Sequence, residues 1–197
     1  MGNRAYRPAP AIAIAAVLIA ACGTSAPRTG IPSASQVASR AQDRNGSACR
    51  TSQLQLTAGP RVSEATEQNT LVLVFRNISA ADCYLRGYPG IALYDGTRRL
   101  SFAYRRGGDQ MLTSAAPALV RLVPRGYAYS AVNKNTCISF TRISAARAEV
   151  TPPGQREPLV LTLPLNPILG YCGASEPGHL IDIAPVEATP VGVLAGR

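Results

Sequence analysis

Short apolar runs separated by turn residues dominate the chain from residue 49 onward. Leu54 and Leu56 alternate with polar residues, whereas residues 71–75 (LVLVF) form a continuous apolar run, typical of a strand covered on both faces. Asp95-Gly96 interrupts residues 91–104 and is a strong turn signal, so we expect a hairpin there. Further strands are expected at residues 118–123, 127–132, 146–151, 159–165 and 179–185.

This spacing predicts an all-β fold. About eight or nine short strands, with almost no helical periodicity, favour a sandwich or a barrel, and we expect an immunoglobulin-like antiparallel β-sandwich. The chain has no tryptophan, so the antibody-type core is not expected and only the general architecture is predicted. We place the sandwich at residues 49–187 and a C-terminal tail at 188–197.

The N-terminal pattern is different and predicts export. Arg4 and Arg7 precede an uninterrupted apolar run at residues 11–21, which is the order of a secretory signal peptide at residues 1–21. The run is shorter than the about 20 residues that span a bilayer. It ends in Ile-Ala-Ala-Cys, which resembles a bacterial lipobox, and that resemblance implies cleavage before Cys22 and a diacylglycerol (with an acyl chain such as palmitate) on its sulfur. A plain secretory signal is the alternative.

Residues 22–48 are small and polar and are expected to form a flexible tether.

The cysteine count supports export. Five cysteines are present, and lipidation of Cys22 leaves four: Cys49, Cys83, Cys137 and Cys172. An even set in an exported chain indicates two disulfides, and the sequence alone permits three pairings. A metal site is not expected, because the four sulfurs are widely spaced and His179 is the only histidine.

Charge adds one candidate surface. The net charge is +9, and removing Arg4 and Arg7 leaves eighteen basic against eleven acidic residues; nineteen of the twenty basic residues are arginine, and Lys134 is the only lysine. Nucleic acid is not an expected partner, since no binding motif is present and exported proteins do not normally meet DNA. Arginines bracket one arm of the expected hairpin, with Phe102 and Tyr104 between them, and would suit anionic headgroups or phosphorylated wall polymers: Arg98, Arg99, Arg105 and Arg106. The alternative is an edge strand that its charges keep from pairing.

Catalytic patterns are weak. No serine lies in G-x-S-x-G, and no phosphate-binding glycine loop is present. His179 is expected to be a surface or strand-end residue, and the carboxylates that would serve a glycosidase fall mostly at turns: Asp82, Asp95, Asp109, Glu149, Glu157 and Asp182. No catalytic residue and no cofactor is predicted.

One segment resembles a known family. Asn77, Cys83 and the run Leu85, Arg86, Gly87, Tyr88, Pro89 and Gly90 resemble the central motif of actinobacterial secreted proteins known as domain of unknown function 4232. Weaker similarities follow in order at residues 122–132, at residues 150–154, at Cys172 and at residues 181–185. In the first of these, Arg125 separates a proline and a glycine that are usually adjacent. The resemblance covers residues 49–186 and implies the pairs Cys49–Cys83 and Cys137–Cys172. It implies no activity.

The L-R-G-Y-P-G run admits two interpretations. In the structural one, Gly87 and Gly90 adopt backbone angles closed to other residues, Pro89 fixes its own φ, Tyr88 packs its ring, and Arg86 binds carbonyls or a carboxylate. In the functional one, Arg86 and Tyr88 contact a ligand. The structural interpretation is favoured, because the run adjoins an expected disulfide.

These patterns together predict a non-catalytic lipoprotein on the extracytoplasmic face of the cell membrane, held by the lipid on Cys22. Its expected partners are an envelope polymer, anionic lipid or another envelope protein. A carrier of lipid or another apolar ligand is the second hypothesis, and an envelope hydrolase the third.

Overall fold

The computed structural model describes residues 46–195 except 64–66, 108–109, 139–141 and 164–168. The signal peptide, Cys22 and most of the tether therefore lie outside the described residues, as does Asp109. Within the described part no helix is long and apolar enough to cross a membrane.

Strands make up nearly all the regular structure of the described residues, together with two short 3-10 helices, η1 (Thr51–Gln53) and η2 (Pro177–His179). The strands are β1 (Ser47–Ala48), β2 (Leu54–Ser63), β3 (Gln68–Asn77), β4 (Cys83–Leu85), β5 (Gly90–Asp95), β6 (Arg98–Arg99), β7 (Ala103–Arg106), β8 (Val120–Leu122), β9 (Tyr127–Asn135), β10 (Ile143–Ser144), β11 (Arg147–Thr151), β12 (Leu159–Thr162), β13 (Gly170–Tyr171) and β14 (Leu180–Ile183).

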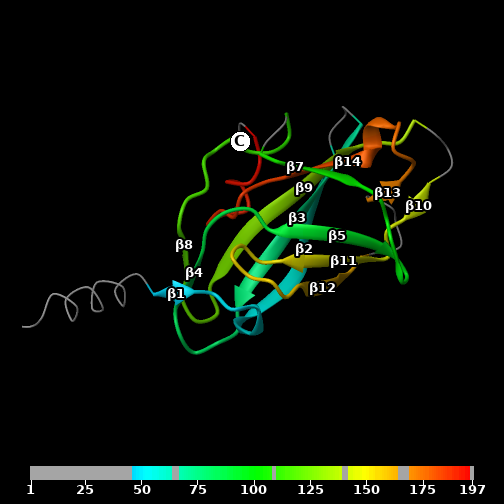
Figure 1. Ribbon diagram of the computed structural model, residues 1–197. Coiled ribbons are helices and arrows are strands. Elements are labelled where there is room, and N and C mark those ends of the chain that lie inside the picture. The colour runs from blue at the N-terminus through cyan, green and yellow to red at the C-terminus, as the bar shows by residue number, and fades with distance from the viewer. Residues whose placement is uncertain (1–45, 64–66, 108–109, 139–141, 164–168, 196–197) are drawn as a thin grey trace, which may run out of the picture.

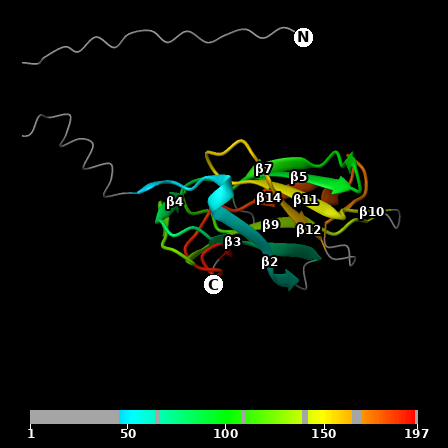
Figure 2. The ribbon, with the colours of Figure 1, turned by 90° about the horizontal axis from the view of Figure 1, so that it is seen from below.

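Two sheets form the body of the molecule. One has the order β2-β3-β9-β14-β7 and the other the order β12-β11-β5-β6. Figure 1 shows β5 crossing in front of β3, and in Figure 2 β5 and β11 lie on the opposite side of the molecule from β2 and β3. The predicted all-β sandwich is confirmed. Its pairing is mixed rather than purely antiparallel, because β14 and β7 run parallel.

The core explains the continuous apolar run of β3. Leu71, Leu73 and Phe75 point between the two sheets and join the main hydrophobic cluster. Val72, which alternates with them, is buried on the other face of the five-stranded sheet. The strand is therefore covered on both faces, as its sequence predicts.

The C-terminal segment supplies that second cover. Val193 is fully buried and packs with Leu112, Val72, Ala131 and Ala184 on the outer face of the five-stranded sheet. The backbone N–H of Ala195 donates to the carbonyl of Met111 at 2.9 Å. The predicted tail begins at residue 188, whereas the packed domain continues to residue 195.

The predicted hairpin at residues 91–104 is correct only in its first half. Tyr94 pairs with Arg99 and Asp95 with Arg98 around the Gly96-Thr97 turn. The chain then leaves this sheet, and β7 pairs in parallel with β14 in the other sheet. Leu100 and Phe102, which lie between β6 and β7, are buried in the main cluster, so the burial of these two side chains carries the strand across the core.

Smaller sheets close the two ends of the sandwich. β1, β4 and β8 form a three-stranded sheet at one end, and β10 and β13 pair at the other (Figure 1). Each end has a disulfide: Cys49–Cys83 beside β1 and β4, and Cys137–Cys172 near β13. The pairing implied by the family resemblance is therefore confirmed.

Candidate functional site

The three-stranded sheet of β1, β4 and β8 is called the end sheet. The L-R-G-Y-P-G run connects this end sheet to the four-stranded sheet. Leu85 ends β4 and is buried, and Gly90 begins β5. Gly87 has a φ of +116°, so its predicted need for glycine is confirmed. The same prediction for Gly90 was wrong, because its backbone is not in the positive-φ region. A Cβ at Gly90 would lie 3.4 Å from the Cβ of Thr151 on β11, which is ordinary van der Waals contact, so packing does not require glycine there either.

Contacts of this run with other segments favour the structural interpretation. The Arg86 Nε donates to the carbonyl of Pro117 at 3.4 Å, and the carbonyl of Gly87 accepts from the N–H of Val186 at 2.8 Å. Pro89 is buried, while Tyr88 is half-buried. The run thus ties together the segment before β8 and the C-terminal segment.

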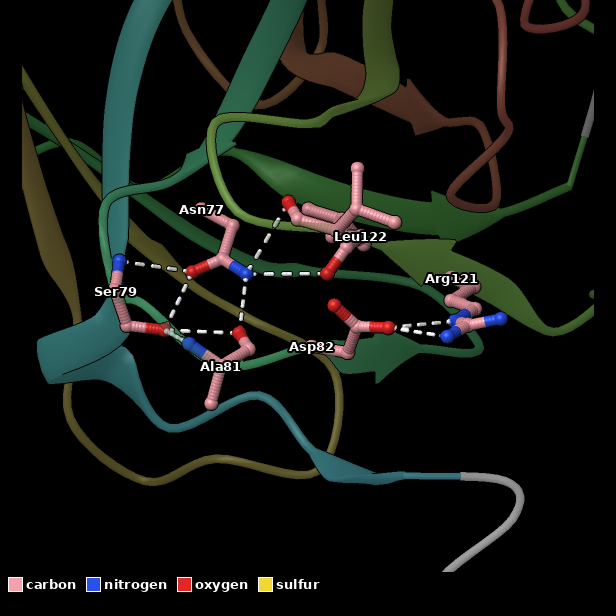
Figure 3. A network of polar contacts seen from close by, with 7 residues as sticks. Asn77, Ser79, Ala81, Asp82, Arg121 and Leu122 are labelled. Carbon is pink, nitrogen blue, oxygen red and sulfur yellow. Dashed lines mark hydrogen bonds and ion pairs between the residues drawn. The ribbon is translucent and has the colours of Figure 1, made fainter.

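Asn77 organises the loop that precedes β4 (Figure 3). Its buried side-chain NH₂ donates to the carbonyls of Ala81 at 2.8 Å, Leu122 at 3.0 Å and Val123 at 3.3 Å. Its side-chain oxygen accepts from the N–H and the hydroxyl of Ser79. One amide side chain therefore joins the end of β3 to the end of β8.

An ion pair closes the same end sheet. Arg121 in β8 donates through both Nε and a terminal NH₂ to one carboxylate oxygen of Asp82 (Figure 3). Arg121 is largely exposed and Asp82 is about two-thirds covered. The Asp82 charge is thus already balanced within the domain.

The turn after β8 places a charged residue in a strained conformation. The N–H of Gly126 donates to the carbonyl of Val123 at 2.7 Å, which closes a four-residue turn with Pro124 and Arg125 at its centre. Arg125 has a φ of +67°, the conformation that a type II turn normally gives to glycine. A Cβ at Gly126 would lie 2.8 Å from the Val123 carbonyl oxygen, so that position requires glycine.

Large apolar side chains are exposed around this turn. Ile78, Val123 and Tyr127 are 57%, 50% and 48% exposed. Ile78 follows Asn77, whose N–H donates to the carbonyl of Gly126 and whose carbonyl accepts from the N–H of Arg125, each at 2.9 Å. The Arg76 guanidinium lies over the Tyr127 ring, 5.8 Å from its centroid. We call Arg76, Ile78, Val123, Arg125 and Tyr127 the turn face.

Sequence reasoning noted Arg125 as a departure from the usual Pro-Gly but did not find the turn face. Tyr127 was assigned to a strand, and the exposure of Ile78 and Tyr127 depends on which segments cover them in the fold. The signal that was present is the apolar and arginine content of residues 123–127, VPRGY, in a turn that is normally polar.

The four arginines of the predicted surface are divided between two sheets. Arg98 and Arg99 lie in β6 of one sheet, whereas Arg105 and Arg106 lie in β7 of the other. Arg98 is paired with Asp95 at 3.1 Å. Ligand contact at these four residues stays a prediction.

Arg105 belongs to a polar row that crosses the five-stranded sheet. Thr70, Asn133, Asp182 and Arg105 are successive partners across β3, β9, β14 and β7. The Thr70 hydroxyl donates to the Asn133 side-chain oxygen at 2.8 Å. Arg105 donates two hydrogen bonds to Asp182, at 2.5 and 2.9 Å, and the Asp182 side chain is only 6% exposed. Arg105 therefore has a structural role in this row, because it pairs with the nearly buried Asp182 carboxylate.

The carboxylates proposed for hydrolysis also have local partners. Asp82, Asp95 and Asp182 each hold an arginine, and Glu149 accepts from the Tyr94 hydroxyl at 3.0 Å. Glu157 is exposed, and its backbone carbonyl accepts from Thr51. Among the described residues no group of three or more His, Cys, Asp or Glu could hold a metal ion.

His179 lies at the opposite end of the sandwich from the turn face. It is the last residue of η2 and directly precedes β14, which agrees with the predicted position at the end of a strand. Its Nδ1 is 2.5 Å from the carbonyl oxygen of Glu176, a contact in which only the nitrogen can donate.

Lys134 was noted as the only lysine but given no role. It is 3% exposed, and its Nζ donates to the Asn135 carbonyl at 2.7 Å and lies 3.9 Å from the Cys137 sulfur. Burial, with a smaller contribution from the charge of Arg142, lowers the pKa of Lys134 to about 8. Gly178 leaves room for it, since a Cβ there would lie 2.9 Å from Nζ.

Comparisons with known proteins give one result. A family model described as "Domain of unknown function (DUF4232)" matches residues 49–191. No curated protein and no solved structure matches the chain. The matched region takes in the Asn77 network, the L-R-G-Y-P-G run, the turn face and both disulfides.

Proposed function

The chain belongs to the DUF4232 family, and we propose that it is a non-catalytic binding or structural module, held on the extracytoplasmic face of the cell membrane by a lipid on Cys22. The family itself names no activity, so the support comes from the residues.

The pairing of the sulfurs carries the proposal. Both disulfides of the domain are formed, so Cys22 is the one cysteine of the chain outside these pairs. It follows an apolar run and a small-residue stretch that suits a lipoprotein signal peptidase. A paired set of four also favours an oxidising compartment, which agrees with export.

Local pairing of the titratable groups supports binding over catalysis. A general acid or base must reach a substrate proton with a free atom at a suitable pKa. Asp82, Asp95 and Asp182 are instead engaged by arginines, and Nδ1 of His179 is engaged by a carbonyl. These contacts favour a scaffold that presents surfaces.

Mass spectrometry of the mature protein from its own host tests the anchor. We expect a chain that begins at Cys22, carries diacylglycerol and acyl mass, and gains two hydrogens for each of two disulfides on reduction. The Cys22→Ser variant is the control and should lack the lipid mass. An unmodified N-terminus, or free sulfhydryls in the folded domain, would overturn the proposal.

Binding to an envelope polymer is tested at the two arginines of the predicted surface for which no ion pair is described. The Arg99→Gln/Arg106→Gln double variant should lose salt-sensitive binding to cell-wall extract, while Arg156→Gln, an exposed arginine elsewhere, should retain it. Equal binding by the two variants would remove this surface.

A further inference from the structure

We propose that the turn face docks on the anionic lipid surface that carries the anchor, with Ile78, Val123 and Tyr127 in the headgroup region and Arg125 and Arg76 against lipid phosphates. This inference rests on the proposed lipid anchor and adds the orientation of the domain on the membrane.

The place where the chain joins the domain gives the first argument. Ser47 pairs with Cys83 in parallel, and Cys83 pairs with Leu122 in antiparallel. Because adjacent strands are about 4.8 Å apart, Ser47 lies about 10 Å from Leu122, directly before the turn. Gly46 also lies against the Asp82 backbone: a Cβ placed on Gly46 would be 3.8 Å from the Asp82 carbonyl oxygen.

β1, β4 and β8 accordingly lie together at one end of the sandwich, away from β10 and β13 (Figure 1). The segment that leads back to Cys22 therefore leaves the domain beside the turn face. An anchor attached at that end favours contact of the same end with the membrane.

The length of the connection gives the second argument. A flexible chain as long as the segment from Cys22 to Gly46 has a root-mean-square reach of about 25–30 Å. A site tethered over such a distance meets its surface at a millimolar effective concentration. Weak docking by a few side chains is then enough to fix the orientation of the domain.

The chemistry of the face gives the third argument. Exposed aliphatic side chains and a tyrosine beside arginines are the composition of segments that lie in a membrane interface. Arginine beside the surface also gains from the negative potential of anionic lipid. Asp82, the carboxylate directly before β4 in the same end sheet, is already bound by Arg121, so it does not neutralise Arg125.

Strain at Arg125 gives a fourth, independent observation. A non-glycine residue in this conformation is disfavoured, and such residues gather where a side chain has a task. Gly126 is required by close contact with Val123, but nothing in the turn requires a cation at position 125.

Fluorescence offers a direct test, because the chain has no tryptophan. The Tyr127→Trp variant, beginning at Cys22 and joined through that sulfur to a maleimide lipid, is placed on vesicles of phosphatidylcholine with phosphatidylglycerol or of phosphatidylcholine alone. The matched control is Ile138→Trp, which lies beyond β9 near the opposite end and is 77% exposed. Brominated lipids then report the depth of each indole.

On anionic vesicles we expect at least twofold stronger quenching, and a blue shift, for the Tyr127→Trp indole relative to the Ile138→Trp indole. Adding Arg125→Glu should reduce this difference to nearly none, while circular dichroism shows the domain folded. Equal quenching of the two indoles, or equal quenching of the Tyr127→Trp indole on neutral and anionic vesicles, would overturn the proposal. Because the lipid is attached chemically, a negative result here is separate from failure of the host to acylate Cys22.

Discussion

Asn77 and Leu122 are 45 residues apart in the chain, and the Asn77 side chain donates a hydrogen bond to the Leu122 carbonyl at 3.0 Å in the buried interior. The bond joins the five-stranded sheet to the end sheet, and it lies between the disulfide Cys49–Cys83 and the turn face. The end of β3 and the end of β8, which are far apart in the sequence, are thereby held together.

Replacing Asn77 should therefore be severe. Asn77→Ala leaves buried carbonyls and the Ser79 N–H without their partner, and we expect a loss of about 2–4 kcal/mol in the free energy of unfolding. Urea denaturation measures the loss. Ser79→Ala, which removes only an outer member of the network, should lose less than about 1 kcal/mol; similar losses for the two variants would contradict the central role of Asn77.

Arg125→Gly should stabilise the domain. Glycine relieves the positive-φ strain, although its greater freedom in the unfolded chain offsets part of the gain, so we expect about 0.5–1 kcal/mol and a higher melting temperature. The same variant should lose vesicle quenching in the tryptophan assay. Gly126→Ala is the opposite control and should destabilise, because its Cβ meets the Val123 carbonyl.

The two disulfides should differ in their contribution. Their sequence separations are 34 and 35 residues, so loop-closure entropy is nearly equal, at about 3–4 kcal/mol each. Cys49 and Cys83 are also buried in the main cluster, whereas Cys137 and Cys172 are half-exposed. We expect Cys49→Ala/Cys83→Ala to lose more stability than Cys137→Ala/Cys172→Ala in parallel urea titrations, and the reverse order would show that the core contribution is small.

Arg105 and Arg98 provide a matched pair of ion pairs. Arg105→Gln leaves the nearly buried Asp182 carboxylate without its cation and should lose about 2–3 kcal/mol. Arg98→Gln breaks an exposed pair and should change stability by less than about 0.5 kcal/mol. Thermal melts at low and high salt measure both; a loss of similar size for the two would mean that water reaches Asp182 freely.

Stability should rise with pH in the range where Lys134 loses its proton. The folded pKa is about 8 and the usual value is 10.5, so between these values the unfolded chain binds more protons than the folded one. Below pH 8 both states are charged and this group contributes no pH dependence. From pH 7.5 to 9.5 we expect a gain of up to about 2 kcal/mol, which Lys134→Met should abolish in urea titrations; parallel curves for the two proteins would exclude the effect.

Strand alternation was enough to predict most of the fold. The apolar run at 71–75 identified a strand covered on both faces because burial on two sides leaves no polar alternation. The family resemblance, not the spacing, supplied the disulfide pairing. The Asp95-Gly96 turn predicted the β5–β6 hairpin correctly.

The errors have a common physical origin. The departure of β7 to the other sheet depends on where Leu100 and Phe102 find their apolar neighbours, and no local pattern encodes that. The exposure of Ile78 and Tyr127 likewise depends on distant segments, since isoleucine is a commonly buried residue type and tyrosine an intermediate one. For the first of these reasons, the four arginines of the predicted surface are divided between two sheets.

The polar row across the five-stranded sheet determines which alignment of its strands is permitted. Successive side chains of a strand point to opposite faces, so a one-residue slip of β9 or β14 would insert Asn133 or Asp182 among the leucines of the main cluster and expel Val132 or Ile181. Misaligned forms of this sheet are therefore penalised at two strands at once, and we expect this penalty to make the domain resistant to strand exchange between copies while it folds.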